Sequence, residues 1–446
     1  MLRVLRQRPF ADLLCAQVVA LLGTGLLTIA LGLLAFDLAG DQAGVVLGTA
    51  LAIKMVAYVC LAPVASAVAE RLSRKTLLVG ADLIRASVAL GLPFIDAVWQ
   101  VYVLIFVLQA ASAAFTPAFQ ATIPDVLPDE EDYTNALSLS RLASELENLI
   151  SPLLAGLLLQ VISFHWLFAG TILGFLASAL LVLAAPLPPR TRASATRSFA
   201  ARLTRGVRIY AKTPRLRGLL GLSLSVASVG AFVIVNTVVM VRAGYGRGDP
   251  DVAYALAAFG AGSMVAALSM PRLLGVMQDR QIMIPAAAIL SLLALGHAAA
   301  MLAVGLLPWP VFLALWLISG MCFSAIITPS GRLLTRSAHA EDRPAVFAAQ
   351  FALSHACWLV AYPLAGWVGS LLGLATALAL LGAMGLLGVL IALRNWPAGD
   401  PVVVAHSHPD LPADHPHLTT TQGGRNTHAH PFIIDDQHPS WPSAGA

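Results

Sequence analysis

Runs of about 20 apolar residues recur from one end of the chain to the other, and they limit what it can fold into. A helix of that length crosses the roughly 30 Å hydrocarbon core of a membrane. Only 11% of the residues are charged, whereas a soluble domain carries about 25%. The sequence therefore predicts an all-α membrane protein with twelve transmembrane helices. The expected spans are 10–36, 44–68, 76–95, 98–120, 135–160, 164–186, 216–242, 250–271, 281–304, 308–330, 345–370 and 372–394.

Several classes of protein are disfavoured. The first span follows Arg3, Arg6 and Arg8, but it is too long for a signal-peptide core and lacks a clear small-residue cleavage site, so we expect a retained helix. The four cysteines lie in apolar segments without C-x-x-C spacing, which argues against a disulfide framework or a thiolate zinc site. The chain has no G-x-x-x-x-G-K-[ST] motif, so a nucleotide-driven pump is not expected. None of these features indicates an enzyme or a required cofactor.

Lysine and arginine are distributed unevenly between the two sides of the expected spans. Lys54 and Arg85 fall within spans, and Arg242 and Arg247 fall between the seventh and eighth. The rest of the 27 lie in or beside the N-terminal segment, the even-numbered loops and the tail. The positive-inside rule then predicts a multi-pass membrane protein with both termini cytoplasmic. The predicted divisions are an N-terminal six-helix half (1–186), a basic cytoplasmic linker (187–215), a C-terminal six-helix half (216–395) and a cytoplasmic tail (396–446).

The two halves resemble each other in sequence. "FTPAFQATIPD" (115–125) corresponds to "ITPSGRLLTRS" (327–337), "SPLLAG" (151–156) to "YPLAG" (362–366), and "SAVAER" (66–71) to "GVMQDR" (275–280). The three matches occur in the same order at an offset of about 210 residues, which indicates a duplicated six-helix unit. Duplicated halves place a substrate site near the membrane midplane, between them.

The loop between the second and third spans reads "SAVAERLSRK" (66–75). It resembles the signature G-x-x-x-D-R-x-G-R-R/K of the major facilitator superfamily. Arg71, Arg74 and Lys75 match it, Glu70 replaces its aspartate, and Ser66 and Ser73 replace its glycines. In the second half Gly275, Asp279 and Arg280 match. The resemblance implies the major facilitator fold, two pseudo-symmetric halves that alternate access to a central site.

Two further stretches resemble the drug-and-siderophore exporters of that superfamily: "GADLIRA" (80–86) and the passage from Thr116 to Gly156. These exporters often carry an acidic residue in the first helix, where this chain has Thr24.

Charged residues near the loop motif can brace helix ends, because an acid beside an arginine fixes the carbonyls and amides that short loops leave exposed. We favour this structural role over direct contact with substrate. The expected bracing residues are Glu70, Arg71, Arg74, Lys75, Asp82, Arg85, Asp279 and Arg280.

Ionisable residues inside spans are candidates for the transport path, because each costs on the order of 2.5–3.5 kcal/mol in hydrocarbon unless it faces a cavity or a partner. The candidates are Lys54, Glu145, Glu147, Asn148 and His355. Glu145 and Glu147 point about 200° apart on a helix, so they do not share one small site. Two simpler alternatives stay open: an ion pair of Glu145 with Arg141, four residues earlier, and a purely structural role for His355.

The tail is polar, broken by proline and glycine, and expected to be disordered. Seven of the chain's eleven histidines lie in it, six of them in His-x-His pairs whose imidazoles point the same way in an extended chain. Imidazole binds Ni²⁺, Co²⁺, Cu²⁺ and Zn²⁺ well. The tail therefore predicts metal binding by His406, His408, His415, His417, His428, His430 and His438, and the simpler alternative is a solvated linker.

A major-facilitator body with a histidine-rich cytoplasmic tail resembles the NreB-type nickel-resistance exporters. The resemblance implies export of Ni²⁺, or of Co²⁺, across the bacterial inner membrane in exchange for protons. The expected partners are the metal ion, protons and the lipid bilayer, with neither nucleic acid nor an obligate protein partner. Two alternatives remain. One is an exporter of drugs or siderophores whose tail is regulatory, and the other is a non-transporting membrane sensor of metal.

Overall fold

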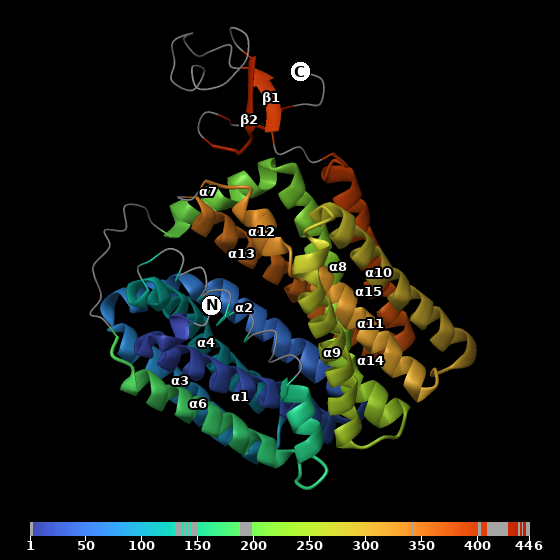
Figure 1. The fold of residues 1–446 in the computed structure, drawn as a ribbon. Helices are drawn as coiled ribbons and strands as arrows, with labels where there is room; N and C mark the ends of the chain where they lie inside the picture. Colours follow the sequence, from blue (N-terminus) through green and yellow to red (C-terminus); the bar gives the residue numbers. More distant parts are fainter. Residues whose placement is uncertain are drawn as a thin grey trace.

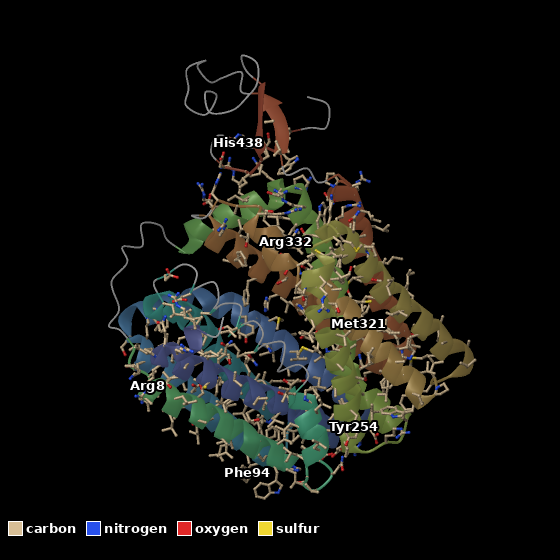
Figure 2. All side chains as sticks on the ribbon, in the orientation of Figure 1. Arg8, Phe94, Tyr254, Met321, Arg332 and His438 are labelled. Carbon is tan, nitrogen blue, oxygen red and sulfur yellow. The ribbon has the colours of Figure 1, made fainter. Side chains whose placement is uncertain are left out.

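The computed structural model describes residues 3–127, 129, 132, 136, 139–140, 143, 150–187, 199–339, 342–399, 403–407, 427–435, 438 and 440–442. Figure 1 shows two groups of helices with a short β-hairpin beyond one of them. In Figure 2, Arg332 and His438 lie toward the hairpin, and Phe94 and Tyr254 lie at the opposite end. We call the end near the hairpin the tail end of the helix bundle. The opposite end is called the seal end, because the two halves come into close backbone contact toward it.

Five long helices are described in the N-terminal half, and short connections join the first four. A 3-10 turn (Val4–Arg6) precedes α1, another (Gly40–Gln42) joins α1 to α2, and a third (Leu92–Phe94) follows α3. Gly40 has a φ of +53°, which a residue with a side chain rarely adopts. Residues 150–158 are also helical and precede α6. The helices are α1 (Arg8–Ala39), α2 (Ala43–Arg71), α3 (Arg74–Gly91), α4 (Val98–Val126) and α6 (His165–Ala184).

The C-terminal half follows α7 (Phe199–Lys212), a helix within the predicted linker. Two π-helical turns, Met240–Gly244 and Leu364–Val368, interrupt its long helices. Such turns often mark functional positions, because they break the regular hydrogen-bond ladder. The helices are α8 (Pro214–Val239), α9 (Asp249–Leu273), α10 (Asp279–Val304), α11 (Trp309–Ile327), α12 (Ser330–Thr335), α13 (Arg343–Pro363), α14 (Gly369–Leu372) and α15 (Leu374–Asn395).

The predicted all-α membrane fold is confirmed. Within the described residues, nine helical segments are long and apolar enough to cross a membrane. One of them, Arg8–Tyr58, contains α1 and the first part of α2. Much of the predicted fifth span, 135–160, lies outside the described residues.

The helices pack closely through glycines. A β-carbon at Gly262 of α9 would lie 1.8 Å from the carbonyl oxygen of Leu317 in α11, and one at Gly320 would lie 1.9 Å from that of Phe259. Apolar side chains gain little by leaving lipid for another helix, so membrane helices associate through such backbone contacts.

The tail departs from the sequence prediction of disorder. Its described part contains two antiparallel strands, β1 (Val403–Ser407) and β2 (Thr427–Pro431). After β2, Phe432 and Ile434 are almost fully buried. For the described residues of 396–446 the prediction is therefore wrong. Proline and glycine disfavour a helix here, but they permit a hairpin. Burial of the apolar residues that follow the hairpin stabilises the folded tail.

The close packing of α9 on α11 gives a stability prediction. Replacing Gly262 with Ala should destabilise the folded protein by about 1–3 kcal/mol, because backbone atoms must move to admit the methyl group. Thermal unfolding in detergent measures the loss. The matched control is Gly296→Ala in α10, where an added β-carbon meets nothing within 4 Å. Equal melting temperatures for the two variants would contradict the packing argument.

Candidate transport site

The two halves meet about halfway along α2 and α13 in an aromatic cluster. The ring of Tyr58, on α2, lies edge-on to the ring of Phe351 at 6.1 Å and to that of His355 at 5.7 Å. Phe351 and His355 lie one turn apart on α13, with ring centroids 3.9 Å apart. The ammonium of Lys54 is 5.8 Å from the centroid of Tyr58. The structure thus brings together Lys54 and His355, which the sequence marked separately.

One nitrogen of His355 is already engaged. Its Nδ1 lies 2.7 Å from the carbonyl oxygen of Phe351, so the neutral ring donates there and keeps Nε2 as an acceptor. Lys54 has no carboxylate partner among the described residues and faces the ring of Tyr58 instead. Glu145, Glu147 and Asn148 lie outside the described residues. The cluster therefore combines a cation, a nitrogen acceptor and aromatic faces between two halves of the molecule.

Closer to the seal end, α2 and α13 approach almost to backbone contact. A β-carbon at Gly48 would lie 2.6 Å from the carbonyl oxygen of Tyr362, and one at Gly366 would lie 2.1 Å from that of Gly44. Asn236 of α8 is buried beside this contact and donates to the carbonyl oxygen of Ala365 at 2.9 Å. We call the contact of Gly44 and Gly48 with Tyr362 and Gly366 the glycine seal.

Side-chain hydrogen bonds extend the seal. The indole of Trp367 donates to the hydroxyl of Thr49 at 3.1 Å, and the hydroxyl of Ser370 donates to Gln42 at 2.5 Å. Both bonds join the N-terminal half to the C-terminal half. The sequence analysis missed these residues, although the paired glycines in "GVVLGTA" (44–50) were a signal.

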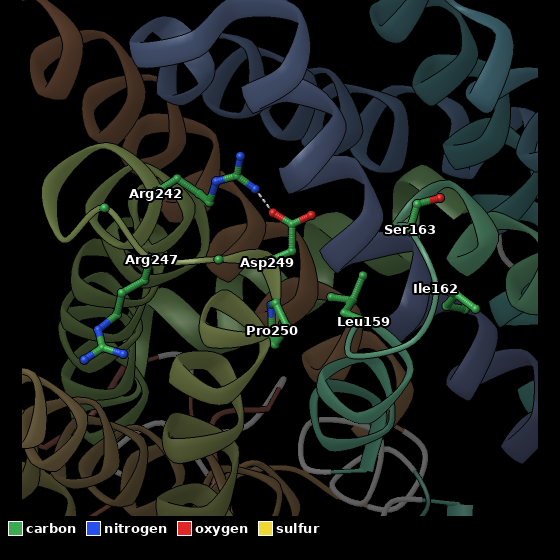
Figure 3. Close-up of a pocket in the computed structure, with 9 residues that line it drawn as sticks. Leu159, Ile162, Ser163, Arg242, Arg247, Asp249 and Pro250 are labelled. Atoms are coloured by element: carbon green, nitrogen blue, oxygen red, sulfur yellow. Dashed lines mark ion pairs between the residues drawn. The ribbon is translucent and has the colours of Figure 1, made fainter.

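A pocket of about 560 Å³ opens at the seal end, where the loop before α6 meets the loop between α8 and α9. Figure 3 shows Arg242 and Asp249 joined in an ion pair on its wall. The Arg242 guanidinium also lies 5.1 Å from the ring of Phe36 at the end of α1. The pocket therefore belongs to the closed seal end and is separate from the cluster around Tyr58. Its lining is Leu159, Ile162, Ser163, Arg242, Gly246, Arg247, Gly248, Asp249 and Pro250.

The predicted bracing residues of the N-terminal half fall into two groups. Arg74 donates to the hydroxyl of Thr122 on α4, and the Lys75 ammonium donates to the carbonyl oxygen of Leu183 on α6 at 2.7 Å. Asp82 and Arg85 instead pair with each other inside the half. The side chains of Glu70 and Arg71 lie outside the described residues.

The Asp82–Arg85 pair is held from three helices. Ser178 of α6 donates to Asp82 at 2.7 Å, and the Arg85 guanidinium lies between the rings of Phe115 and Phe175, 4.2 and 4.6 Å from their centroids. Both charged residues are almost completely buried. These contacts tie α3 to α4 and α6.

The C-terminal half repeats the loop arrangement. Asp279 is buried 3.5 Å from both Arg332 and Arg336 of the segment after α11. Arg280 donates to the carbonyl oxygen of Trp396 at 2.9 Å. Lys75 and Arg280 thus make similar contacts, although they are not matched in the repeat. Each bonds a carbonyl at the C-terminal end of the last helix of its half, where the helix dipole attracts a cation. The sequence analysis named Lys75 and Arg280 but not these partners.

The tail histidines are described only in part. The strand register makes His406 the Cα partner of His428, and His430 follows in the same strand. The side chains of these three, and all of His408, His415 and His417, lie outside the described residues. His438 is buried, and its Nδ1 lies 2.8 Å from Asp435. No group of three metal-ligating side chains occurs among the residues that the structure describes.

The carboxyl of Asp435, in the tail, has a shifted pKa. Burial raises the pKa of this carboxyl, but the side chain and amide of His438 and the side chain of His339 lower it by more. The net effect is a pKa well below the ordinary value, so Asp435 is a carboxylate at neutral pH.

Comparisons of this chain with a family model and with known proteins agree on one family. The family model described as Major Facilitator Superfamily matches residues 13–307. An uncharacterized MFS-type transporter of Bacillus subtilis, YfiS, is 28% identical over 184 residues, 40% of this chain and 43% of that protein. Macrolide efflux protein A of Enterococcus faecalis is 29% identical over 136 residues, 29% of this chain and 42% of that protein. The matches thus span less than half the length of these relatives.

Solved structures share the fold at low sequence identity. A bacterial homologue of the lysosomal transporter Spinster, inward-facing and unoccupied, has a TM-score of 0.67 at 13% identity, covering 87% of this chain and 97% of that one. A D-xylose-proton symporter has a TM-score of 0.66 at 14% identity, covering 88% and 97%.

The glycine seal gives a prediction about the contact between the halves. Replacing Gly366 with Leu should separate the halves at the seal end, because the side chain collides with the backbone of Gly44. Spin labels at Asp41 and Leu371, on a background without native cysteines, should report a longer and broader distance distribution. Gly80→Leu in α3, where an added β-carbon meets nothing within 4 Å, is the control. An unchanged short distance in the Gly366 variant would rule out the seal.

Proposed function

Because the chain belongs to the Major Facilitator Superfamily and is a multi-pass membrane transporter, we propose that it is a secondary active exporter of divalent transition metal ions, Ni²⁺ first and Co²⁺ second. The observation that supports a metal ion as the substrate is the hairpin with its three histidine positions. Its register pairs position 406 with position 428, and position 430 shares their face of the hairpin because alternate residues of a strand do. Three imidazole positions on one face suit Ni²⁺, Co²⁺, Cu²⁺ or Zn²⁺.

The proposed direction of transport is outward from the cytoplasm. The distribution of lysine and arginine assigns the tail end to the cytoplasm of a bacterial cell and the seal end to the periplasm. A hairpin at the cytoplasmic end can bind the ion before export. Its imidazoles bind metal only when neutral, so loading should weaken as the pH falls below about 6.5.

Proton exchange is the proposed driving reaction. Moving two positive charges out against an inside-negative potential of 100 mV costs about 2.3 kcal/mol per charge, and inward protons can supply it. Lys54 alone would repel a divalent cation, so a nearby carboxylate must balance it. We assign that role to Glu145 or Glu147, with Asn148 and His355 as neutral ligands on the path.

Export of an organic molecule is the second candidate. Tyr58, Phe351 and His355 offer aromatic faces between the halves, and Lys54 would favour an anionic or polar organic molecule over a cation. The similarity to macrolide efflux proteins also favours export of an organic molecule. Here the tail would regulate transport. The third alternative, a sensor that does not transport, has no support from the family.

Expression should lower cellular nickel and raise tolerance to Ni²⁺, because the exporter removes cytoplasmic ion. Nickel content by mass spectrometry, beside Co, Zn, Cu and Cd and a panel of macrolides and dyes, measures this against cells without the protein. Unchanged nickel content together with reduced macrolide or dye accumulation would establish the organic-molecule function instead.

Glu145→Gln or Glu147→Gln should abolish Ni²⁺ flux driven by a pH gradient in inverted membrane vesicles while membrane levels stay normal. The reason is that a neutral amide cannot carry the exchanged proton. His355→Ala should weaken flux without removing its response to the gradient. Glu131→Gln, in the loop before the fifth span, is the matched control. Full activity in both glutamate variants would exclude them from the coupling step.

A further inference from the structure

The end of the tail, after the histidine hairpin, contains a cluster of buried side chains. Phe432, the first residue after β2, is only 3% exposed, and His438 is 4% exposed. The ring of Phe432 lies 4.8 Å from that of His438 and 5.0 Å from that of Trp441. We call the described residues 432–435, 438, 440 and 441 the latch segment. Figure 2 shows His438 against the tail end of the helix bundle.

One arginine of the body holds both the latch segment and a cytoplasmic loop. Arg215, in the first turn of α8, is 2% exposed. Its guanidinium lies 5.2 Å from the ring centroid of Trp441, and Nη2 donates to the carbonyl oxygen of Phe432 at 3.4 Å. Its Nε donates to the hydroxyl of Ser337 at 2.8 Å. The latch segment and the loop 337–342 therefore share a buried cation.

A carboxylate makes the second connection. Asp435 accepts from the amide of His438 at 2.7 Å, and its other oxygen lies 3.2 Å from Nε2 of His339. His339 belongs to the loop 337–342, whereas Asp435 and His438 belong to the tail. Two independent contacts thus fasten the latch segment to the same short loop.

The same loop holds the linker between the halves. Asp342 is buried and accepts from Nε and Nη2 of Arg205, on α7, at 2.5 and 2.8 Å. Tyr210 of α7 is hydrogen-bonded to Gln350 of α13. A β-carbon at Gly206 would lie 2.0 Å from the carbonyl oxygen of Ala345. Within the loop, the amide of Asp342 donates to the carbonyl oxygen of His339 at 2.9 Å. The described loop residues therefore connect the latch segment to α7.

We propose that the latch segment is a regulatory element that sets the position of α7, and that metal binding by the hairpin histidines controls transport through it. The second part rests on the proposed function. Phe432 directly follows the last residue of β2, so a metal ion bound between the two strands acts on the latch segment through the adjacent residue. A tail that only collected ions would need no contact with the linker.

The first arm of the test measures the latch without any transported substrate. In full-length protein, Asp435→Asn should raise amide hydrogen exchange of loop 337–342 and of residues 199–212 about tenfold, because the loop loses a fastening. Asp414→Asn, a tail carboxylate outside the latch segment, should exchange as the wild type does. Wild-type exchange in the Asp435 variant would overturn the proposal.

The second arm measures Ni²⁺ flux in vesicles at low and high nickel, with a chain ending after Pro397 for comparison. Asp435→Asn keeps every histidine. If the latch controls transport, this variant should lose flux at low nickel as the truncated chain does, and both should recover at high nickel. Wild-type flux at low nickel would overturn the regulation. Absence of nickel flux in the wild type, with accelerated exchange in Asp435→Asn, would refute the proposed substrate and support the latch.

Discussion

No water reaches the hydrocarbon core, so each peptide group in it must find its hydrogen bond within its own helix. Helices built under that constraint gain little from apolar contact, because lipid tails are as apolar as leucine. What joins them here is close backbone packing. Gly262 and Gly320 permit it within the C-terminal half, and Gly44 with Gly366 permit it between the halves. The same device therefore packs helices within the C-terminal half and joins the two halves at one end.

Charges are accommodated in three ways according to their position. Inside the N-terminal half, Asp82 and Arg85 neutralise each other within one helical turn. At the loops, Lys75 and Arg280 bond carbonyls at helix ends, where the dipole favours a cation. Lys54 has neither arrangement among the described residues. Its ammonium lies 5.8 Å from the ring of Tyr58, which in turn contacts His355 of the other half. A cation at a contact that must open and close is the expected position for transport chemistry, since its partner can change with conformation.

The tail illustrates how a polar, proline-broken segment acquires structure. Three histidine positions, 406, 428 and 430, lie on the strands of a hairpin. After the hairpin, Phe432 is buried and accepts a hydrogen bond from Arg215, and the ring of Trp441 faces the same guanidinium. Burial of Phe432 and Ile434 supplies the favourable free energy that the polar residues lack. The consequence is a metal-binding candidate joined to the transport body by a folded connection rather than a loose tether.

The sequence by itself determined the fold class and the positions of most spans, because hydrocarbon thickness is a local constraint that each helix satisfies alone. It also marked Lys54 and His355 as candidates for the transport path and Lys75 and Arg280 as candidates for bracing helix ends. Only the tertiary structure decided their partners, since helix crossings bring together Tyr58 and His355, nearly 300 residues apart along the chain. It likewise decided that the tail docks. Composition reports the average polarity of that segment, whereas docking depends on a few apolar residues meeting one arginine on a surface that exists only once the helices have packed.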